Sequence, residues 1–369
     1  MTRHETHVRY DIAESGILPL SVDDLLNFEP PEARAATRER LLALPLGYSE
    51  ARGTEALRQQ LAATYARGDA EHILVTTGAI EANFLLFNVL LDAGDHVIAP
   101  YPAYQQLYSV PQAIGCDVSL WHVGPDTGYR YDLAALERLI TPRTRVIVVN
   151  TPHNPTGAML PPEDARRIYE LGRDAGATVI GDEAYRWLAV PDGDPFAAPM
   201  FDLGEHGVSV GTLSKPFGLP GLRIGWIAGP PDLVRRCWGL RDYISLSPGK
   251  LNDALAQLAM THRDRIVERN RRIIEANLAT ATRWMSDRSD FMSWTPPRGG
   301  LLALLKYDLP IASLELADRL ATEYSVMLAP GSAFGYEHHL RLGIGQRPDI
   351  FEAGLCETGK CLDVVRKNA

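Results

Sequence analysis

The sequence of 369 residues is poor in lysine, in cysteine and in long apolar runs. Only five of its 37 basic residues are lysines, namely Lys215, Lys250, Lys306, Lys360 and Lys367. A coding bias toward arginine explains the shortage, yet an enzyme that needs a reactive amine has few positions for it here. The four cysteines form neither a CxxC motif nor a disulfide-like framework, which favours a reducing cytoplasm.

Other absences exclude whole classes of partner. No apolar run is long enough to span a bilayer, and the polar N-terminus has no signal-peptide core. The net charge of -9 argues against nucleic acid or an anionic membrane, since either would require a basic face. His338 and His339 are the only adjacent histidines and there is no HExxH, so no metal site is expected. We therefore expect a cytoplasmic protein that binds neither nucleic acid, membrane nor metal.

Short β-branched runs alternate with amphipathic helical stretches between about Gly53 and Tyr243. Buried strands are predicted at 72–77, 96–100, 145–150, 178–181 and 208–211, with helices at 80–92, 104–114 and 162–175 among them. This alternation predicts an α/β fold with a mainly parallel sheet wrapped by helices. Such sheets bind ligands at the carboxyl ends of their strands, so the loops after these runs are the first candidates for a site.

From about Asp253 the pattern changes. A long arginine-rich helix at 263–287 is followed by apolar segments at 300–307 and 326–330 and a helix at 312–323. These elements predict a smaller α+β domain, to which residues 10–26 return. Because 369 residues exceed a typical single core, we predict an N-terminal segment (1–45) that packs with the small domain, a large domain (46–250) and a small C-terminal domain (251–369).

The predicted strands end in residues suited to a ligand. Gly78 opens a helix after the first strand, and the free N–H groups of a helix N-terminus suit a phosphate. Tyr104 follows the second strand, and Asn154 lies in the proline-fixed loop TPHNPTG after the third. Asp182 follows the fourth strand, where a buried carboxylate is costly without a cationic partner.

The fifth strand leads into TLSKPFGLPGLR (212–223), which gathers two hydroxyls, an amine and a guanidinium in one turn. A lysine at a strand exit and among apolar residues can have a lowered pKa and act as a nucleophile. Each feature alone is explained by a capped helix or a surface charge. Their order along the chain points to one site built around Lys215.

The stretches TPHNPTG, DEAY and TLSKPFGLPGLRIGW resemble the fold-type-I enzymes of aminotransferase class I/II, and the resemblance covers nearly the whole chain. It implies the aspartate aminotransferase-like fold, pyridoxal 5′-phosphate (PLP) as cofactor and an amino acid as substrate. Lys215 would hold PLP as a Schiff base and move the proton of the substrate's α-carbon. Asp182 would pair with the ring nitrogen, so that the ring can absorb carbanion charge. Asn154 and Tyr185 would hydrogen-bond the ring's phenolate oxygen, and Tyr104 would stack on the ring.

The same resemblance implies the remaining contacts. The phosphate would lie on the backbone N–H groups of Gly78, Ala79 and Ile80, with Thr212, Ser214 and Arg223 closing around it. Tyr48 matches a tyrosine that reaches the phosphate of a partner subunit, which makes the expected active unit a homodimer. Arg341 matches the arginine that grips the substrate α-carboxylate, for which a planar guanidinium fork is suited.

Glu14 departs from the family pattern, because family members usually carry a glycine-rich loop where this chain has residues 11–18. Glu14 is either a solvated side chain or a group that faces a cationic substrate, since a carboxylate there would reject an acidic one. No arginine is assignable as a receptor for a side-chain carboxylate. We therefore predict an aminotransferase that acts on a basic or neutral amino acid.

A second reaction stays open. Residues 212–226, 241–248 and 297–300 also resemble capreomycidine synthases, PLP cyclases that act on hydroxylated arginine in specialised metabolism. The same carbanion can be transaminated or can expel a β-leaving group, so the sequence does not separate the two. A PLP-binding transcription regulator would need a basic winged-helix domain ahead of the fold, and a Rossmann dehydrogenase a GxGxxG after its first strand; the chain shows neither.

Overall fold

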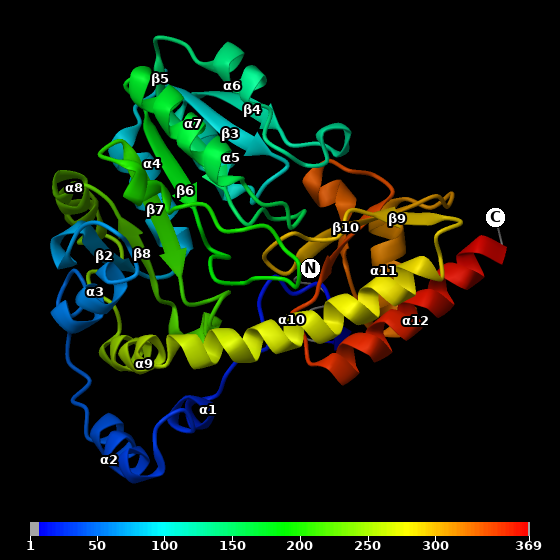
Figure 1. The fold of residues 1–369 in the computed structure, drawn as a ribbon, viewed down its shortest axis with the longest axis horizontal. Coiled ribbons are helices and arrows are strands. Elements are labelled where there is room, and N and C mark those ends of the chain that lie inside the picture. The colour runs from blue at the N-terminus through cyan, green and yellow to red at the C-terminus, as the bar shows by residue number, and fades with distance from the viewer. Residues whose placement is uncertain (1–6, 368–369) are drawn as a thin grey trace.

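The computed structural model describes residues 7–367 as a large sheet wrapped by helices beside a smaller sheet, with a long helix running beneath both (Figure 1). The large sheet has seven strands in the order β2-β8-β7-β6-β5-β3-β4. They are β2 (Ile73–Thr76), β3 (His96–Tyr101), β4 (Asp117–His122), β5 (Thr144–Asn150), β6 (Thr178–Asp182), β7 (Gly207–Thr212) and β8 (Gly225–Ala228). Only β8 is antiparallel to its neighbours, which confirms the predicted mainly parallel sheet.

Helices cover both faces of this sheet (Figure 1). They are α3 (Glu55–Ala62), α4 (Ala79–Leu90), α5 (Gln106–Ile114), α6 (Leu133–Leu139), α7 (Pro162–Asp174), α8 (Pro231–Arg241) and α9 (Lys250–Thr261). Along β5, Val146 and Val148 pack in one apolar cluster with α4, α5 and α8, whereas Ile147 and Val149 pack in another with α6 and α7. The strand is therefore apolar on both faces, as its continuous β-branched run predicts.

The five predicted strands and the three named helices match observed elements to within two residues at each end. Helix α7 shows the local reasons: proline lies at its start, two acids in its first turn and Arg173 in its last, all favourable for a helix dipole. Strands β4 and β8 lie outside the predicted runs. β4 is an edge strand with partly exposed residues, and β8 has only four residues, so neither forms a long buried run.

The smaller part contains an antiparallel sheet in the order β12-β13-β10-β9. Its elements are β9 (Met292–Trp294), β10 (Leu302–Tyr307), β11 (Val326–Met327), β12 (Ala329–Pro330), β13 (His339–Gly343), α10 (Arg263–Ser286), α11 (Ser313–Tyr324) and α12 (Pro348–Lys367). The N-terminal strand β1 (Tyr10–Asp11) pairs in parallel with β11, whereas Leu25 and Leu26 pack with α3 and α9 beside the large sheet. The predicted limits at residues 45 and 250 stay predictions.

The remaining elements are short. Helices α1 (Val22–Leu26) and α2 (Pro31–Leu42) lie below the large sheet in Figure 1. Single 3-10 turns occupy η1 (Ala70–His72), η2 (Pro125–Thr127), η3 (Met200–Leu203), η4 (Pro220–Leu222) and η5 (Gly331–Phe334). Within residues 7–367, no helix combines the length and the apolar character needed to cross a membrane.

Candidate active site

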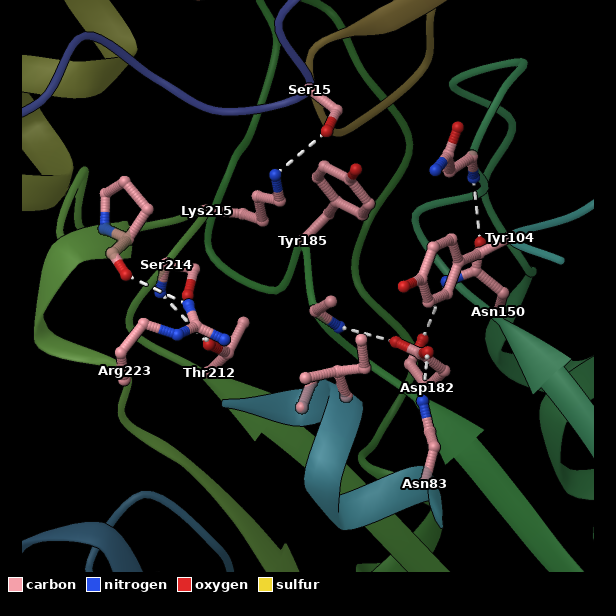
Figure 2. A pocket seen from close by; sticks show the side chains of 15 residues that line it. Ser15, Asn83, Tyr104, Asn150, Asp182, Tyr185, Thr212, Ser214, Lys215 and Arg223 are labelled. Atoms are coloured by element: carbon pink, nitrogen blue, oxygen red, sulfur yellow. Dashed lines mark hydrogen bonds between the residues drawn. The ribbon is translucent and has the colours of Figure 1, made fainter. Parts of the chain in front are cut away.

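The carboxyl ends of the parallel strands surround one cavity of about 240 Å³ (Figure 2). The cavity is lined by Ser15, Ala79, Ile80, Asn83, Tyr104, Asn150, Asn154, Asp182, Ala184, Tyr185, Thr212, Ser214, Lys215, Pro220 and Arg223. The loops after β2, β3, β5, β6 and β7 each contribute, as expected for a sheet of this topology. Most of the predicted site residues thus meet in one place, although up to 144 residues separate them along the chain (79 to 223).

Asp182, at the end of β6, is 3% exposed and accepts hydrogen bonds at both carboxylate oxygens. Oδ2 accepts from Asn83 Nδ2 at 3.0 Å, and Oδ1 accepts from the Ala184 N–H at 3.1 Å. Burial raises the pKa of Asp182, and these two hydrogen bonds oppose that rise. Among residues 7–367 no cationic side chain forms an ion pair with it. A buried carboxylate with donors but no cation suits a ligand that brings positive charge.

Asn150, the last residue of β5, links Asp182 to the next loop. Its Nδ2 donates to the Asp182 backbone carbonyl at 3.0 Å, and its Oδ1 accepts from the Asn154 N–H at 2.8 Å. Asn154 Oδ1 in turn accepts from Arg341 Nη1 at 3.2 Å. These contacts fix the Asn154 side chain between the floor of the cavity and Arg341.

His153 holds the same loop from below. Its Nε2 lies 2.9 Å from the Pro102 carbonyl and must donate to it, so in the neutral ring Nδ1 accepts from the Thr156 hydroxyl at 2.8 Å. Burial lowers the pKa of His153 to about 4. The imidazole is therefore neutral at physiological pH and serves to fix the backbone that carries Asn154.

Arg341, on β13, is 5% exposed and adjoins the cavity through Asn154. Nη2 donates to the Ala13 carbonyl at 2.9 Å, and the guanidinium lies 5.1 Å from the centre of the Phe334 ring. Its buried Nε has no hydrogen-bond partner among the described residues. Burial lowers the pKa of Arg341, and the charges of Tyr185, Glu14 and Asp11 act in the opposite direction. This donor set suits a ligand carboxylate.

Lys215 enters the cavity from the turn after β7 and meets the N-terminal segment (Figure 2). Its Nζ donates to Ser15 Oγ at 2.8 Å and lies 3.4 Å from Glu14 Oε1. Burial lowers the pKa of Lys215, whereas the Glu14 carboxylate acts in the opposite direction. Ser15 also lies near the buried hydroxyl of Tyr185. An amine with a lowered pKa can act as a nucleophile or a base.

The opposite end of the cavity suits an anion. The first turn of α4 follows Gly78, whose φ of +79° favours glycine, and a Cβ there would lie 2.6 Å from Arg223 Nη2. Arg223 donates to the carbonyls of Thr77 and Pro220, and the hydroxyls of Thr212 and Ser214 lie 3.0 Å apart. A helix N-terminus, two hydroxyls and a guanidinium together make a phosphate-type site.

Three predicted residues lie at the edge of this arrangement and one lies outside it. Gly78, Arg341 and Glu14 adjoin lining residues. Tyr48 is 83% exposed and does not line the cavity of its own chain. Ser15, Asn83 and Asn150 line the cavity but were absent from the predicted set. Asn150 ends a predicted strand and Ser15 follows Glu14, so position could have suggested both. Asn83 lies inside a helix, where no local pattern marks it.

The residues present fit PLP. The cofactor would bring a phosphate for the Arg223 end, a ring nitrogen able to carry positive charge for Asp182, and an aldehyde for Lys215. The buried Asp182 carboxylate, which lacks a cation of its own, is the most specific part of this match.

Comparison with known proteins agrees with the fold. The family model for aminotransferase class I and II matches residues 15–353. The chain is 34% identical to capreomycidine synthase from Streptomyces vinaceus over 94% of this chain and 87% of that one. It is 31% identical to the arginine–pyruvate transaminase AruH of Pseudomonas aeruginosa, over 89% and 85%.

Two solved structures are similar over almost their whole length. A PLP-dependent aminotransferase from Streptococcus suis superposes with a TM-score of 0.93 at 32% identity, covering 99% of this chain and 96% of that one. The PLP-dependent cyclase OrfR superposes with a TM-score of 0.89 at 34% identity, covering 100% and 96%. The predicted aspartate aminotransferase-like fold is thereby confirmed.

Proposed function

The chain belongs to the aminotransferase class I and II family, whose members depend on PLP, and from that premise we propose that it is a PLP-dependent cyclase. Its substrate is an amino acid with a guanidino side chain and a β-hydroxyl, and its product is a ring formed with loss of water. This reverses the order of the sequence-based prediction, which placed transamination first. The likeness to capreomycidine synthase and to the cyclase OrfR supports cyclisation better.

The observation that carries the substrate class is the position of Glu14. Its carboxylate lies 3.4 Å from Lys215 Nζ, in the part of the site that belongs to the N-terminal segment. A cationic side chain is favoured next to a carboxylate and an acidic one is repelled. The likeness to an arginine–pyruvate transaminase supports the same side chain.

The site geometry supports the following binding roles as part of the proposal. Arg341 holds the α-carboxylate with its unpaired donor, Asp182 holds the ring nitrogen, and the Arg223 end holds the phosphate. Asn154 and Tyr185 hydrogen-bond the ring oxygen. Tyr104, which lines the cavity on another side, stacks on the ring.

The chemistry begins at the α-carbon. When bound, PLP supplies an electron sink for the pair left there as the proton departs. Lys215, with its lowered pKa, takes that proton. The bond between the β-carbon and its hydroxyl then breaks with the electron pair on oxygen, and a proton passed from Lys215 converts the hydroxyl to water. Ser15, 2.8 Å from Nζ, is the hydroxyl placed to carry that proton.

Ring closure restores the balance of atoms. A guanidino nitrogen bonds to the β-carbon and releases a proton to Glu14. Glu14 passes this proton to Lys215, whose Nζ lies 3.4 Å away, and Lys215 returns it to the α-carbon. The sum is the loss of one water with the α-amino group retained.

The test is a product analysis. The enzyme is incubated with PLP and a panel of amino acids that includes arginine, β-hydroxyarginine and neutral amino acids, and the product masses are measured. Loss of one water from hydroxyarginine, with the α-amino and guanidino groups both retained, supports the proposal. Formation of a 2-oxo acid, with transfer of the amino group to pyruvate, would establish the second candidate, an aminotransferase. That candidate is supported by the similarity to AruH and to the Streptococcus suis protein.

We also propose that the active unit is a homodimer. Tyr48 is 83% exposed, and Tyr243, on a segment that the buried Arg241 ties to Ala51, is 90% exposed. Such exposed aromatic side chains indicate an interaction surface. Inactive Tyr48→Phe and Lys215→Ala proteins, mixed and allowed to exchange subunits, should regain part of the activity through hybrid dimers with one intact site. A fully active monomer, or mixtures that never regain activity, would contradict the proposal.

A further inference from the structure

Asn83 lies in the second turn of α4 and is 1% exposed. Its Nδ2 donates to Asp182 Oδ2 at 3.0 Å and lies 3.5 Å from Gln106 Oε1 (Figure 2 shows the contact with Asp182). Its Oδ1 is buried and has no partner among the described residues. A buried amide oxygen without a partner is costly, so another contact must fix the direction in which the Asn83 amide points.

Gln106 fixes which way this amide points. Gln106 Nε2 donates to the Ile80 carbonyl at 2.6 Å, so the glutamine presents its oxygen to Asn83. A flipped Asn83 would direct its Oδ1 at two acceptors, the Gln106 oxygen and the Asp182 carboxylate. The flipped form is therefore excluded, and the NH2 group must face Asp182.

The consequence concerns the charge of Asp182. Both of its oxygens face donors, since Oδ1 accepts from the Ala184 N–H and Oδ2 from Asn83. A proton on Oδ2 would meet the Asn83 NH2 group and break that bond. Asn83 is the one side-chain donor to this carboxylate among the described residues, and the backbone donor cannot be changed by substitution.

We propose that Asn83 is a positioning residue that keeps the buried Asp182 carboxylate charged and aimed at the ring nitrogen of PLP. This rests on the part of the proposed function that assigns PLP to the cavity, and is independent of substrate and product. Through Gln106 and Ile80, the same amide chain ties the carboxylate to the first turn of α4. The ring-nitrogen end and the phosphate end of the cavity are thus held in one hydrogen-bonded unit.

The experiment measures cofactor binding to the full chain freed of PLP. The apparent dissociation constant is determined by absorbance for PLP and for 1-deazapyridoxal 5′-phosphate, in which carbon replaces the ring nitrogen. Asn83→Leu, similar in size, should weaken PLP on the order of tenfold to a hundredfold, the worth of a hydrogen bond to a charged group. It should leave the affinity for the deaza analogue unchanged, because that analogue makes no contact for Asn83 to support.

A second background and a control variant sharpen the result. In an Asp182→Asn protein, Asn83→Leu should cause no further loss of PLP affinity. Asn88→Leu, an exposed position on the same helix, is the matched control and should bind both cofactors normally. If Asn83→Leu folds poorly, Gln106→Leu, which frees the Asn83 amide to turn, should give the same selective loss at smaller amplitude.

Equal losses for PLP and its deaza analogue, or a full loss in the Asp182→Asn background, would overturn the role of Asn83 and leave the proposed function standing. A transaminated product would instead overturn the proposed cyclisation and leave the role of Asn83 standing.

Discussion

The two walls of the cavity differ in how they are held. The sheet wall, which comprises Asn83, Asn150, Asn154 and Asp182, is buried. Its side chains are fixed by hydrogen bonds between strand ends, from α4 or, for Asn154, from Arg341 on β13. The N-terminal wall, residues 11–18, places Glu14 and Ser15 beside Lys215, and the Glu14 side chain is 46% exposed. A rigid buried wall suits the part of a ligand that is the same in every turnover. An exposed side chain such as that of Glu14 can differ between relatives without disturbing the core, to which Ile12 and Ile17 of the same segment belong.

Under the proposed function, the cofactor binds the sheet wall and the substrate side chain faces the N-terminal wall. The segment 11–18 is attached to the smaller part by the β1–β11 pair and by a hydrogen bond from Leu18 N–H to the Gly345 carbonyl at 2.7 Å. Substitutions on the two walls should therefore have effects of different kinds as well as different sizes.

The largest effect is expected at Lys215, where the walls meet. Lys215→Ala should abolish the borohydride-stable label from PLP and slow loss of the α-proton on the order of 10⁴-fold, because both the attachment point and the base are removed. Peptide mass mapping after reduction and proton exchange into deuterated water measure the two. Lys250→Ala, on α9 and outside the cavity lining, is the control and should keep the label. A label that persists in Lys215→Ala would refute the assignment.

Arg341 should affect all substrates alike. Removing its guanidinium leaves the α-carboxylate unpaired, so Arg341→Ala should lower kcat/KM for cationic and neutral amino acids by a similar amount, roughly 2–4 kcal/mol. The matched control is Arg347→Ala, whose guanidinium pairs with Asp349 at the surface. A loss confined to cationic substrates would mean that Arg341 acts on the substrate side chain, and the two walls would then not have separate roles.

His153 offers a test of the sheet wall through pH. Its pKa is about 4 in the folded protein, against about 6.5 when unfolded. Because the unfolded chain binds the proton first, the free energy of unfolding should fall as pH drops from about 6.5 to about 4, by about 3 kcal/mol in total. Denaturant titrations across this range should show a shallower pH slope for His153→Gln, which lacks the titrating ring. An unchanged slope would show that the ring is not buried as a neutral group.

The smallest and most selective effect is expected at Glu14. Glu14→Gln should weaken guanidino substrates by roughly 1 kcal/mol, because the carboxylate is partly exposed and screened, and should leave small neutral amino acids unchanged. Asp23→Asn, on the exposed side of α1, is a control of equal charge change. If aspartate and glutamate were the preferred substrates and Glu14→Gln had no effect, the N-terminal wall would have no part in recognising a cationic side chain.

Local patterns along the sequence were enough to predict most strands of the large sheet and the edge at which the cavity lies. The β-branched runs predicted five strands of the large sheet, since strands buried on both faces must be continuously apolar. Glycine, proline and single polar residues after those runs marked most of the cavity, because carboxyl ends of parallel strands share one edge. These inferences need only the order of residues within each run.

Tertiary structure alone decided the rest. Nothing in the local sequence distinguishes Asn83 from other positions of an apolar helix. Only the packing of α4 against the large sheet brings its amide to Asp182, 99 residues away. Ser15 and Glu14 meet Lys215 across about 200 residues, through a segment that docks on the smaller part. Hydrogen bonds between such distant residues depend on side-chain directions that packing sets. The periodicity within either segment does not predict these hydrogen bonds.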